Sequence, residues 1–557
     1  MTSRPLSKHI PFILLILALL VFGLFTAADY GLSWDEPLFY EYGEALGYAY
    51  TPANWFRTDF DLNNAYGSSG DDHKTRGPAY LILARTPVHA LESLGVDSPS
   101  AWHLVNFLTF LLGVYFIYRL SLRWMSEWAA FGAAALFSTQ PLLLGHAFIN
   151  PKDMPFLVFF TGALLFGFEM VDVLKDENKS RKQKWGRVFL AAFFLGIATS
   201  IRVLAPLVGI LVVIYAIIRQ RSTVNHQPST TNRSLALLLL AYALLSILFM
   251  LAFWPYLWES PLKNFIQVFL FMSENPTGLR VLFGGEIYRA YELPRRYLPT
   301  LLTITLTEPV WPLFFTGIFF ALWKAVVSVR PVKSTRSYST TESLDQQLKA
   351  NSQSLTAFFL TITAFLIPFL YVITLRPPMY DGFRHFLFIL PPVFVTAGLG
   401  FQVLINWFQS TSALSRFSSW LYAGIVFIIF AVNIVPAANL HPFEYAYYNS
   451  LIGGTGGAFR TYETDYWLTC YKQAVEELNV LAPANLYVHR EAYIAATYAA
   501  PGLNVLDERG NLKNIRSGDY ILVNSRTNED RKTFHDAPSV IEVGRGGAVF
   551  CVVKQAP

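Results

Sequence analysis

Charged side chains are scarce in this sequence, at 15% of its residues, whereas a soluble globular protein carries about 25%. Apolar residues make up 53%, which argues against a single water-soluble domain. Cysteine is scarce too: Cys470 and Cys551 are the two in the chain, and neither has a metal-ligand spacing. The net charge of +5 includes no basic stripe outside the predicted loops, which excludes nucleic acid as a partner.

The apolar residues gather in runs of about 17–25 residues, the length that crosses the hydrocarbon core of a bilayer. They predict about eleven transmembrane helices, at residues 10–27, 101–119, 127–145, 154–173, 188–200, 203–219, 235–255, 308–326, 355–374, 384–404 and 419–438. The two runs within 188–219 also fit one long helix kinked near Arg202. The first run follows Arg4 and Lys8 without a clean cleavage site, so we predict a retained helix rather than a signal peptide.

Basic residues are distributed unequally between the two sides of the membrane. This is seen when successive loops are assigned to alternate sides, starting from a cytoplasmic N-terminus. The cluster Lys175–Arg187 and most other basic residues fall on the cytoplasmic side. The short outer loops hold only Lys152, Arg202, Arg376 and Arg384. Because positive loops stay in the cytoplasm, the N-terminus is predicted to be cytoplasmic. An odd number of spans then places the C-terminus outside, in an integral protein of a bacterial-type inner or plasma membrane.

Two regions follow from this arrangement. Residues 1–438 are predicted to form a transmembrane domain with large outer loops at 28–100 and 254–307. Residues 439–557 are predicted to form an extracytoplasmic C-terminal region. Two polar segments, rich in Ser, Thr, Asn and Gln, are predicted as solvated cytoplasmic linkers, at 222–234 and 329–353.

The C-terminal region has the composition of a water-soluble fold. Asp465–Leu478 is predicted to be helical. Strand patterns, with β-branched and aromatic residues bounded by Gly or Asp, follow at 485–489, 519–524 and 548–553. We predict a small α/β domain of about 90 residues from them. It contains both cysteines, and either a disulfide between Cys470 and Cys551 or two buried free thiols fits the sequence.

Adjacent carboxylates stand just after the first span, where Asp35 and Glu36 lie among aromatic residues. Such surroundings have a low dielectric constant and make a carboxylate a better general base. The same residues fit an ordinary helix N-terminus, with Asp35 as the N-cap and Pro37 in the first turn. Asp153 stands at the mouth of the fourth span, where it fits both a helix cap and a substrate contact.

Cationic and aromatic residues gather on the same predicted side. His73, Lys74 and Arg76 suit a bound phosphate, or a solvated loop before an interfacial helix. The second large loop and the tenth span add Tyr288, Arg289, Arg295, Arg296, Arg384 and His385. The residues of that loop suit a lipid phosphate and a sugar ring, or they anchor the loop at the membrane interface. Arg202 should face protein, water or an anion unless it lies in a short outer turn, because an unpaired Arg in a bilayer is costly.

The order of these motifs resembles that of the GT-C glycosyltransferases. It is most similar to family 39, the type of the protein O-mannosyltransferases and the lipid A aminoarabinose transferases. The motifs that carry the resemblance are Trp34–Phe39, Asp72–Lys74, Lys152–Pro155, Arg384–Pro391 and His441–Asn449. After Lys74 this sequence has Thr75, Arg76 and Gly77 where the family has Pro-Pro-Leu. The resemblance reaches about residue 470 and does not include the terminal domain.

The resemblance implies transfer of a sugar from a polyprenyl-phosphate donor to a protein, lipid or glycan acceptor at the outer membrane face. A phosphate leaving group needs cations rather than an acid, and the acceptor hydroxyl needs a base. Asp35 is predicted to be that base in an inverting single displacement, with Glu36 beside it as a second catalytic residue. Asp153, His73 and Tyr288 are predicted to contact substrate. The candidates for binding the donor phosphate are Lys74, Arg289, Arg295, Arg296, Arg384 and His385.

Two other functional classes fit parts of the sequence. A transporter or flippase of lipid-linked substrates predicts ionisable residues deep within several spans, broken helices and repeats. Here nearly all charges stand at helix ends, with Arg202 as the exception. A non-catalytic scaffold would leave the carboxylates of the first loop unexplained. A divalent metal fits beside paired carboxylates, but no ligand spacing demands one, and no cofactor is predicted.

Overall fold

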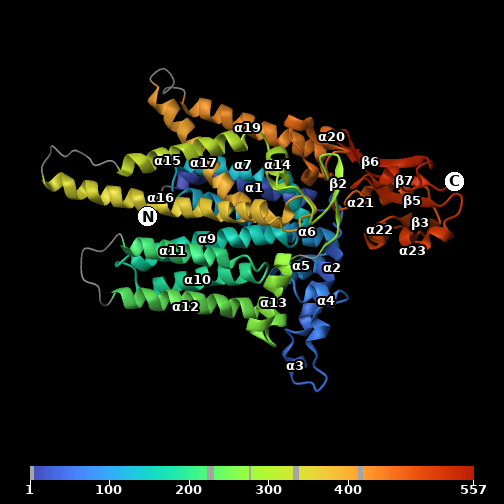
Figure 1. The fold of residues 1–557 in the computed structure, drawn as a ribbon, viewed down its shortest axis with the longest axis horizontal. Helices are drawn as coiled ribbons and strands as arrows, with labels where there is room; N and C mark the ends of the chain where they lie inside the picture. Colours follow the sequence, from blue (N-terminus) through green and yellow to red (C-terminus); the bar gives the residue numbers. More distant parts are fainter. Residues whose placement is uncertain (1–5, 222–230, 275–276, 330–337, 412–417) are drawn as a thin grey trace.

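The computed structural model describes residues 6–221, 231–274, 277–329, 338–411 and 418–557. Its helices run along the long axis of the molecule, and a small sheet stands at one end (Figure 1). The bundle consists of α1 (Ile10–Thr26), α6 (Ser98–Ser121), α7 (Glu127–Ser138), α8 (Pro141–Ile149), α9 (Asp153–Lys175), α10 (Arg181–Thr199), α11 (Pro206–Arg221), α12 (Thr231–Ala252), α15 (Val310–Val329), α16 (Tyr338–Leu375), α17 (Leu390–Ser410) and α19 (Ser418–Leu440).

Eight helical segments in the described ranges are long and apolar enough to cross a membrane, and nine if α7 and α8 form one bent span. These two helices meet at 63°, where Pro141 starts α8 and lacks the amide hydrogen that would continue α7. The predicted pair within 188–219 is two helices, α10 and α11. Because Ser180 and Gln183 form a capping box, α10 starts at Arg181, earlier than predicted.

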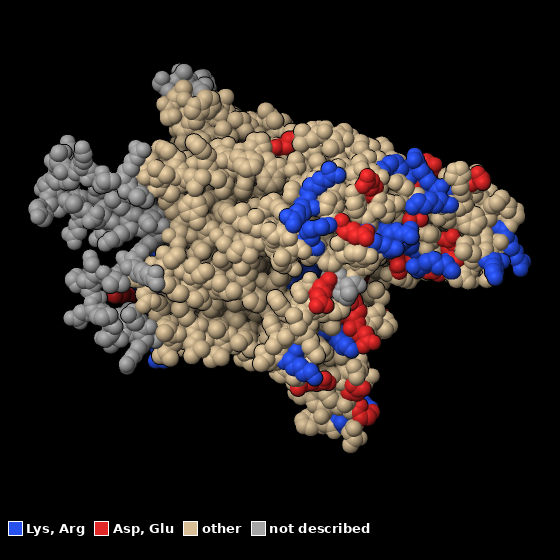
Figure 2. Space-filling model, viewed as in Figure 1, with Lys and Arg blue, Asp and Glu red and all other residues tan. Residues whose placement is uncertain are grey.

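The flank of the bundle is apolar. In Figure 2 it is almost free of charged side chains, which gather instead over the outer loops and the C-terminal sheet. The helices α12 and α15 expose large apolar side chains there, such as Leu244 at 58% and Phe319 at 75%. Lipid accommodates such side chains, and each helix satisfies its own backbone hydrogen bonds. The predicted polytopic, all-helical membrane fold with a small C-terminal α/β region is confirmed, whereas the predicted number of about eleven spans is not.

The two large loops that are predicted to lie outside, at 28–100 and 254–307, fold into short elements at the same end of the bundle as the sheet. They contain α2 (Glu36–Ala45), α3 (Pro52–Trp55), α4 (Gly70–His73), α5 (Ala79–Ser93), α13 (Pro261–Glu274), the hairpin of β1 (Arg280–Phe283) and β2 (Glu286–Arg289), and α14 (Tyr297–Thr305). The first loop rests closely on the break between α10 and α11: a Cβ at Gly77 would stand 2.0 Å from the Ser200 carbonyl oxygen, so this contact requires glycine. The amphipathic helix α13 runs across the bundle axis and exposes Leu262 and Leu270 (Figure 1).

The C-terminal region is built on a five-stranded sheet with strand order β4-β3-β5-β7-β6. Its elements are α20 (Gly454–Ala458), α21 (Tyr471–Asn479), β3 (Asn485–Val488), α22 (Ala492–Tyr498), β4 (Asn504–Asp507), α23 (Glu508–Asn511), β5 (Tyr520–Asn524), β6 (Ser539–Arg545) and β7 (Ala548–Gln555). β3 pairs in parallel with β4 and β5, and β7 pairs antiparallel with β5 and β6. Alternate residues of the strands pack in two apolar clusters, one of which includes α21 and α22.

The sequence predicted part of this region. The strands predicted at 485–489, 519–524 and 548–553 correspond to β3, β5 and β7, while β4 and β6 were not predicted. The helix predicted from Asp465 begins instead at Tyr471, because the Asp465 carboxylate accepts hydrogen bonds from the Thr469 and Cys470 amides ahead of it. Cys470 and Cys551 form a disulfide that joins the start of α21 to β7.

The two predicted linkers fall largely outside the described residues. The segment 222–234 has a described backbone only from Thr231, where α12 begins. Within 329–353, the described backbone resumes at Tyr338 as the first part of α16, so a helix replaces the predicted linker from that residue.

Candidate functional site

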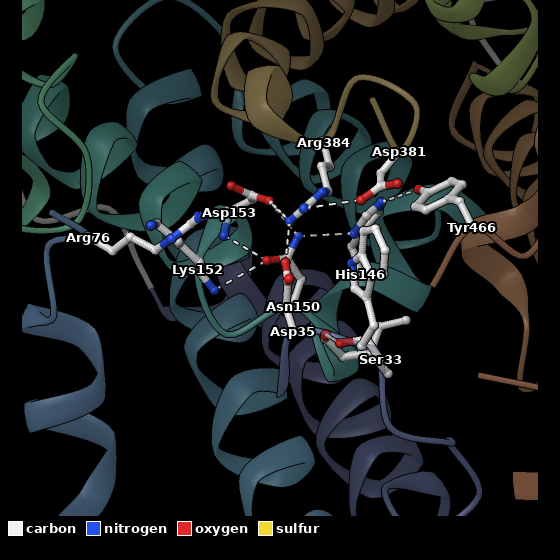
Figure 3. A network of polar contacts seen from close by, with 12 residues as sticks. Ser33, Asp35, Arg76, His146, Asn150, Lys152, Asp153, Asp381, Arg384 and Tyr466 are labelled. Atoms are coloured by element: carbon white, nitrogen blue, oxygen red, sulfur yellow. Dashed lines mark hydrogen bonds and ion pairs between the residues drawn. The ribbon is translucent and has the colours of Figure 1, made fainter. Parts of the chain in front are cut away.

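Three helix starts, far apart in the sequence, bring a buried cluster of charges together at the end of the bundle that adjoins the C-terminal domain (Figure 3). Asp35 directly precedes α2, Asp153 is the first residue of α9, and Arg384 opens the short helix η5 (Arg384–Ile389). Arg384 Nη1 donates to Asp35 Oδ2 at 2.7 Å and to Asp153 Oδ2 at 3.3 Å. Asp153 also pairs with Arg202, which lies in the break between α10 and α11.

The turn between α8 and α9 fixes the orientation of Asp153. Asn150 Oδ1 accepts the amides of Lys152 at 3.2 Å and Asp153 at 2.7 Å, and its Nδ2 donates to Asp153 Oδ2 at 3.2 Å. Asn150 also donates to His146 Nδ1 at 3.2 Å, while His146 Nε2 is hydrogen-bonded to the Tyr466 hydroxyl at 2.9 Å. The side chain of Asp153 is therefore held on all sides, and only 1% of it is exposed.

Asp35 and its neighbour Glu36 lie in different surroundings. The Asp35 side chain is 26% exposed, so a molecule from outside can reach its carboxylate. Glu36 is fully buried; it accepts the Ser33 amide at 2.6 Å, lies 3.1 Å from His103 Nε2 and is bonded to the Tyr40 hydroxyl. The geometry thus makes Asp35 the available carboxylate, while Glu36 fastens the first loop to the bundle.

A second group of charges extends the cluster into the C-terminal domain. Arg384 Nη2 lies 3.1 Å from Asp381 Oδ2, and Arg526 Nη2 lies 2.6 Å from Asp381 Oδ1. Arg526 Nε donates to Glu463 Oε1 at 2.9 Å. Burial raises the pKa of Asp381 above its ordinary value and raises the pKa of Glu463 to about 7.

The raised pKa of Glu463 predicts a pH-dependent stability. The folded protein keeps a proton on Glu463 that the unfolded chain, with an ordinary value of 4.5, has lost. The contribution of Glu463 to stability should therefore be complete below pH 4.5 and fall as the pH rises to about 7, by about 3 kcal/mol in total. Melting curves against pH should show this decline in the wild type but not in Glu463→Gln. The exposed control Glu477→Gln should keep the decline, and a pH-independent difference between wild type and Glu463→Gln would contradict the prediction.

A cavity of about 620 Å³ adjoins the cluster. Arg76, Lys152, Arg202 and His385 line one part of it, and Asp72 pairs with Arg76 at 2.5 Å. The remaining wall is largely apolar and includes Val203, Leu204, Trp254, Val268, Phe269 and Met272. Burial and the charges of Arg76 and Arg202 hold the pKa of Lys152 well below its usual range. Cations crowded in this way favour a bound anion, and the apolar wall favours a hydrocarbon chain.

The structure places His73 and Lys74 beside the cavity but not in its lining. His73 is buried, with Nδ1 2.7 Å from the Tyr66 carbonyl oxygen and its ring stacked on Tyr42. Lys74 turns outward and pairs with the exposed Asp71 at 2.6 Å. Arg76, two residues further on, faces the cavity instead.

Four other predicted contacts lie on the β1–β2 hairpin and the turn after it. Tyr288 donates to Glu286 at 2.5 Å, Arg289 donates to the Gly278 carbonyl at 2.8 Å, and Arg296 lies over the Phe283 ring at 5.8 Å. Arg295 is exposed. None of these four is among the described residues that line the cavity. The structure thus unites Asp35, Asp153, Arg384 and His385 and leaves the hairpin residues apart.

Several residues of the cluster were not predicted as site residues. Arg202 carried a signal, since it interrupts an apolar run, and Lys152 lies within a motif that was noted. Arg76 was named with His73 and Lys74 as suited to a bound phosphate, but of the three only Lys74 was a candidate for the donor phosphate. Asp381 lies only three residues before Arg384 but was not predicted to pair with it. Arg526 carried no comparable signal, because its partners Asp381 and Glu463 are distant in sequence. Within the described part of the chain, no group of three or more His, Cys, Asp or Glu side chains is placed to hold a metal ion.

Comparison with known proteins gives one match by family and several by structure. Residues 90–257 match the family described as dolichyl-phosphate-mannose-protein mannosyltransferase. The fold is similar to ArnT from Cupriavidus metallidurans in the apo state, with 13% identity, 97% of each chain covered and a TM-score of 0.47. ArnT bound to undecaprenyl phosphate gives 14% identity, 97% of this chain and 98% of that chain, and a TM-score of 0.49.

A further similar structure is the oligosaccharyltransferase of Archaeoglobus fulgidus in the apo form. The two chains are 12% identical, the match includes 91% of this chain and 69% of the oligosaccharyltransferase chain, and the TM-score is 0.47. No curated protein sequence gives a significant match. The family match agrees with the resemblance to family 39. Of the five motifs, Lys152–Pro155 lies within the matched range, which also contains Arg202.

Proposed function

We propose that this chain transfers a sugar from a polyprenyl-phosphate donor to an acceptor hydroxyl at the outer face of the membrane. The observation that carries the proposal is the pairing of an accessible carboxylate, Asp35, with a neighbouring cavity that is cationic in one part and apolar in the rest. A lipid-linked phosphate has this combination of an anion and a long hydrocarbon chain. The match to a family named for a dolichyl-phosphate sugar supports the same donor class.

The proposed reaction is a single displacement. The oxygen of Asp35 that does not bind Arg384 takes the proton of the acceptor hydroxyl. At the same time, the hydroxyl oxygen attacks the anomeric carbon of the sugar. The bond from that carbon to the phosphate oxygen breaks, and its electron pair leaves with the phosphate. Arg76, Lys152 and Arg202 stabilise the charge that builds there. Attack from the side opposite the phosphate inverts the anomeric configuration.

Transfer in liposomes tests the proposal. Purified protein would be supplied with polyprenyl phosphates that carry different radiolabelled sugars, together with a panel of protein, lipid and glycan acceptors. We expect label in an acceptor, an equal amount of released polyprenyl phosphate and an inverted anomeric centre. If no donor and acceptor pair gives transfer, the function is not that of a transferase. Movement of intact donor across the bilayer would then identify a flippase.

Arg76 and Lys74 are neighbouring cations of the first loop, and their variants can be compared in the KM for the donor. Arg76→Met should raise the KM for the donor about 10- to 100-fold, because a hydrogen bond to a charged group contributes about 1.5–3 kcal/mol. Lys74→Met should leave the KM within about twofold, because an exposed ion pair contributes little. Initial rates at varied donor concentration measure both. An equal rise in the two variants, or a larger one for Lys74→Met, would contradict the assignment of Arg76.

A further inference from the structure

The loop after β5 carries a cation from the C-terminal domain to the outer end of the bundle. Arg526 is buried, and its own amide donates to Asn524 Oδ1 at 2.6 Å. The preceding Ser525 is fixed to β7 by its amide, which donates to the Phe550 carbonyl at 2.8 Å. Asn524 Nδ2 in turn donates to the Asp465 carbonyl at 3.1 Å. The backbone at Arg526 is thus held firmly on the sheet, and its guanidinium has a defined position.

Two contacts of this guanidinium lead to Asp35. Arg526 pairs with Asp381 at 2.6 Å, and Asp381 pairs with Arg384, which binds Asp35. The guanidinium also lies 4.9 Å from the ring centre of Trp34, the residue next to Asp35 in the chain. Arg526 therefore reaches the surroundings of Asp35 by two routes: through Asp381, which pairs with Arg384, and through Trp34, the chain neighbour of Asp35. It has no direct ion pair with Asp35.

The charges around Arg384 give Arg526 a specific task. Arg384 faces three carboxylates, at 2.7 Å for Asp35, 3.1 Å for Asp381 and 3.3 Å for Asp153. Asp153 is also paired with Arg202, and Asp381 with Arg526. With its own cation in place, Asp381 competes less for Arg384, which stays closest to Asp35. Without Arg526, the buried carboxylate of Asp381 would have Arg384 as its remaining cation, since a buried charge needs a partner. Asp381 would then draw Arg384 away from Asp35.

We propose that Arg526 is a positioning residue for sugar transfer, which keeps Arg384 on Asp35 by occupying Asp381. The inference rests on the proposed function, because it assigns the C-terminal domain a part in that reaction. The C-terminal domain is then a structural part of the site, although the residues that line the cavity come from the helix bundle and the large loops.

Kinetics of variants in liposomes test the inference. Arg526→Met should lower kcat about 10- to 100-fold, since a small misplacement of a reacting group costs about that much. The KM for the donor should change less than about twofold, because the variant leaves the cationic lining of the cavity intact. Arg526→Lys should be intermediate, because one ammonium group cannot reproduce the two directed contacts to Asp381 and Glu463.

The matched control is Arg460, another arginine of the C-terminal region. It forms a two-pronged pair with Asp530, with both contacts at 2.6 Å, and so stabilises the same region away from Asp381. Arg460→Met should keep kcat within about twofold of the wild type, because its ion pair does not adjoin Asp35. If Arg460→Met lowers kcat as much as Arg526→Met does, Arg526 merely stabilises the domain and the inference is overturned.

A double variant tests the route through Asp381. Asp381→Asn removes the competing charge, so Arg526→Met with Asp381→Asn should recover kcat to within about threefold of the wild type. It should also fold if Arg526→Met alone does not, because it leaves no uncompensated carboxylate at Asp381. A double variant that is as slow as Arg526→Met, or slower, would refute a role through Asp381.

Hydrogen exchange separates this inference from the proposed function. In Arg526→Met, the backbone of 380–386 should exchange on the order of tenfold faster than in the wild type, while Arg460→Met leaves it unchanged. If the wild type transfers no sugar, the proposed function fails, and faster exchange still supports the link from Arg526 to the Arg384 turn. Unchanged exchange in Arg526→Met refutes that link whether or not the wild type is active.

Discussion

Asp35→Asn is expected to lower the kcat of sugar transfer about 10³-fold, the scale of a lost general base. An asparagine of nearly the same shape can still accept the hydrogen bond from Arg384, but its amide cannot take the proton of the acceptor hydroxyl. The fold and the KM for the donor should change little, because the cationic lining of the cavity is untouched. Single-turnover and steady-state transfer from a radiolabelled donor measure the loss.

Asp71→Asn is the matched control for this variant. Asp71 belongs to the same outer loop, is fully exposed and pairs with Lys74, so its amide should leave kcat within about twofold. Full activity of Asp35→Asn would show that another group takes the proton. Loss of activity in both variants would point to damage of the loop rather than to a lost base.

Arg384→Met is expected to destabilise the folded protein by about 3–5 kcal/mol, the cost of removing one partner of a buried ion pair. Methionine keeps much of the side-chain volume but leaves Asp35, Asp153 and Asp381 without the cation that they share. Transfer should be lost as well, because Asp35 is no longer held in place. Thermal unfolding in detergent, followed by fluorescence, measures the change in stability.

Arg295→Met serves as the control for Arg384→Met. Arg295 is an exposed arginine of the outer loop, and its replacement should change the stability by less than about 0.5 kcal/mol. The same variant should also keep its activity if the hairpin arginines take no part in binding the donor phosphate. An unchanged melting temperature in Arg384→Met would show that Arg384 is not needed to compensate the three carboxylates.

Much of the fold was predictable because a bilayer imposes a simple pattern. The span predicted at 10–27 is α1, which ends one residue earlier, and the span predicted at 154–173 is α9, which begins one residue earlier and ends two residues later. The bend between α7 and α8 and the early start of α10 were missed. Both depend on local backbone chemistry, a proline at a helix start and a capping box, which hydrophobicity along the chain does not record.

The site was predictable where its residues stand at helix ends. Asp35, Asp153 and Arg384 each open a helix on the predicted outer side, and the structure brings the three together. Position alone could not decide whether Lys74 or Arg76 faces inward, because the two lie in one short turn and differ only in direction. The link from Arg526 to Asp381 depends on how the terminal domain docks, which no local pattern encodes.

The structure also bears on the transporter alternative. Arg202 was the charge that favoured it, because an arginine deep within a span suggests a pathway for polar substrates. It lies instead in the break between α10 and α11, where it pairs with Asp153 and lines the cavity beside the charge cluster. Its position is thus accounted for by the same site that carries the proposed transfer.

The placement of Arg526 also has a consequence for the synthesis of the chain. A ribosome makes Asp35 before Arg384, and Arg384 before Arg526. A growing chain can insert its helices, and even form the cavity, before the last of these residues exists. If Arg526 positions Arg384 as proposed, transfer can begin only after the C-terminal domain has folded onto the bundle. Chains that stop before Arg526 would then occupy the membrane without carrying out the proposed transfer.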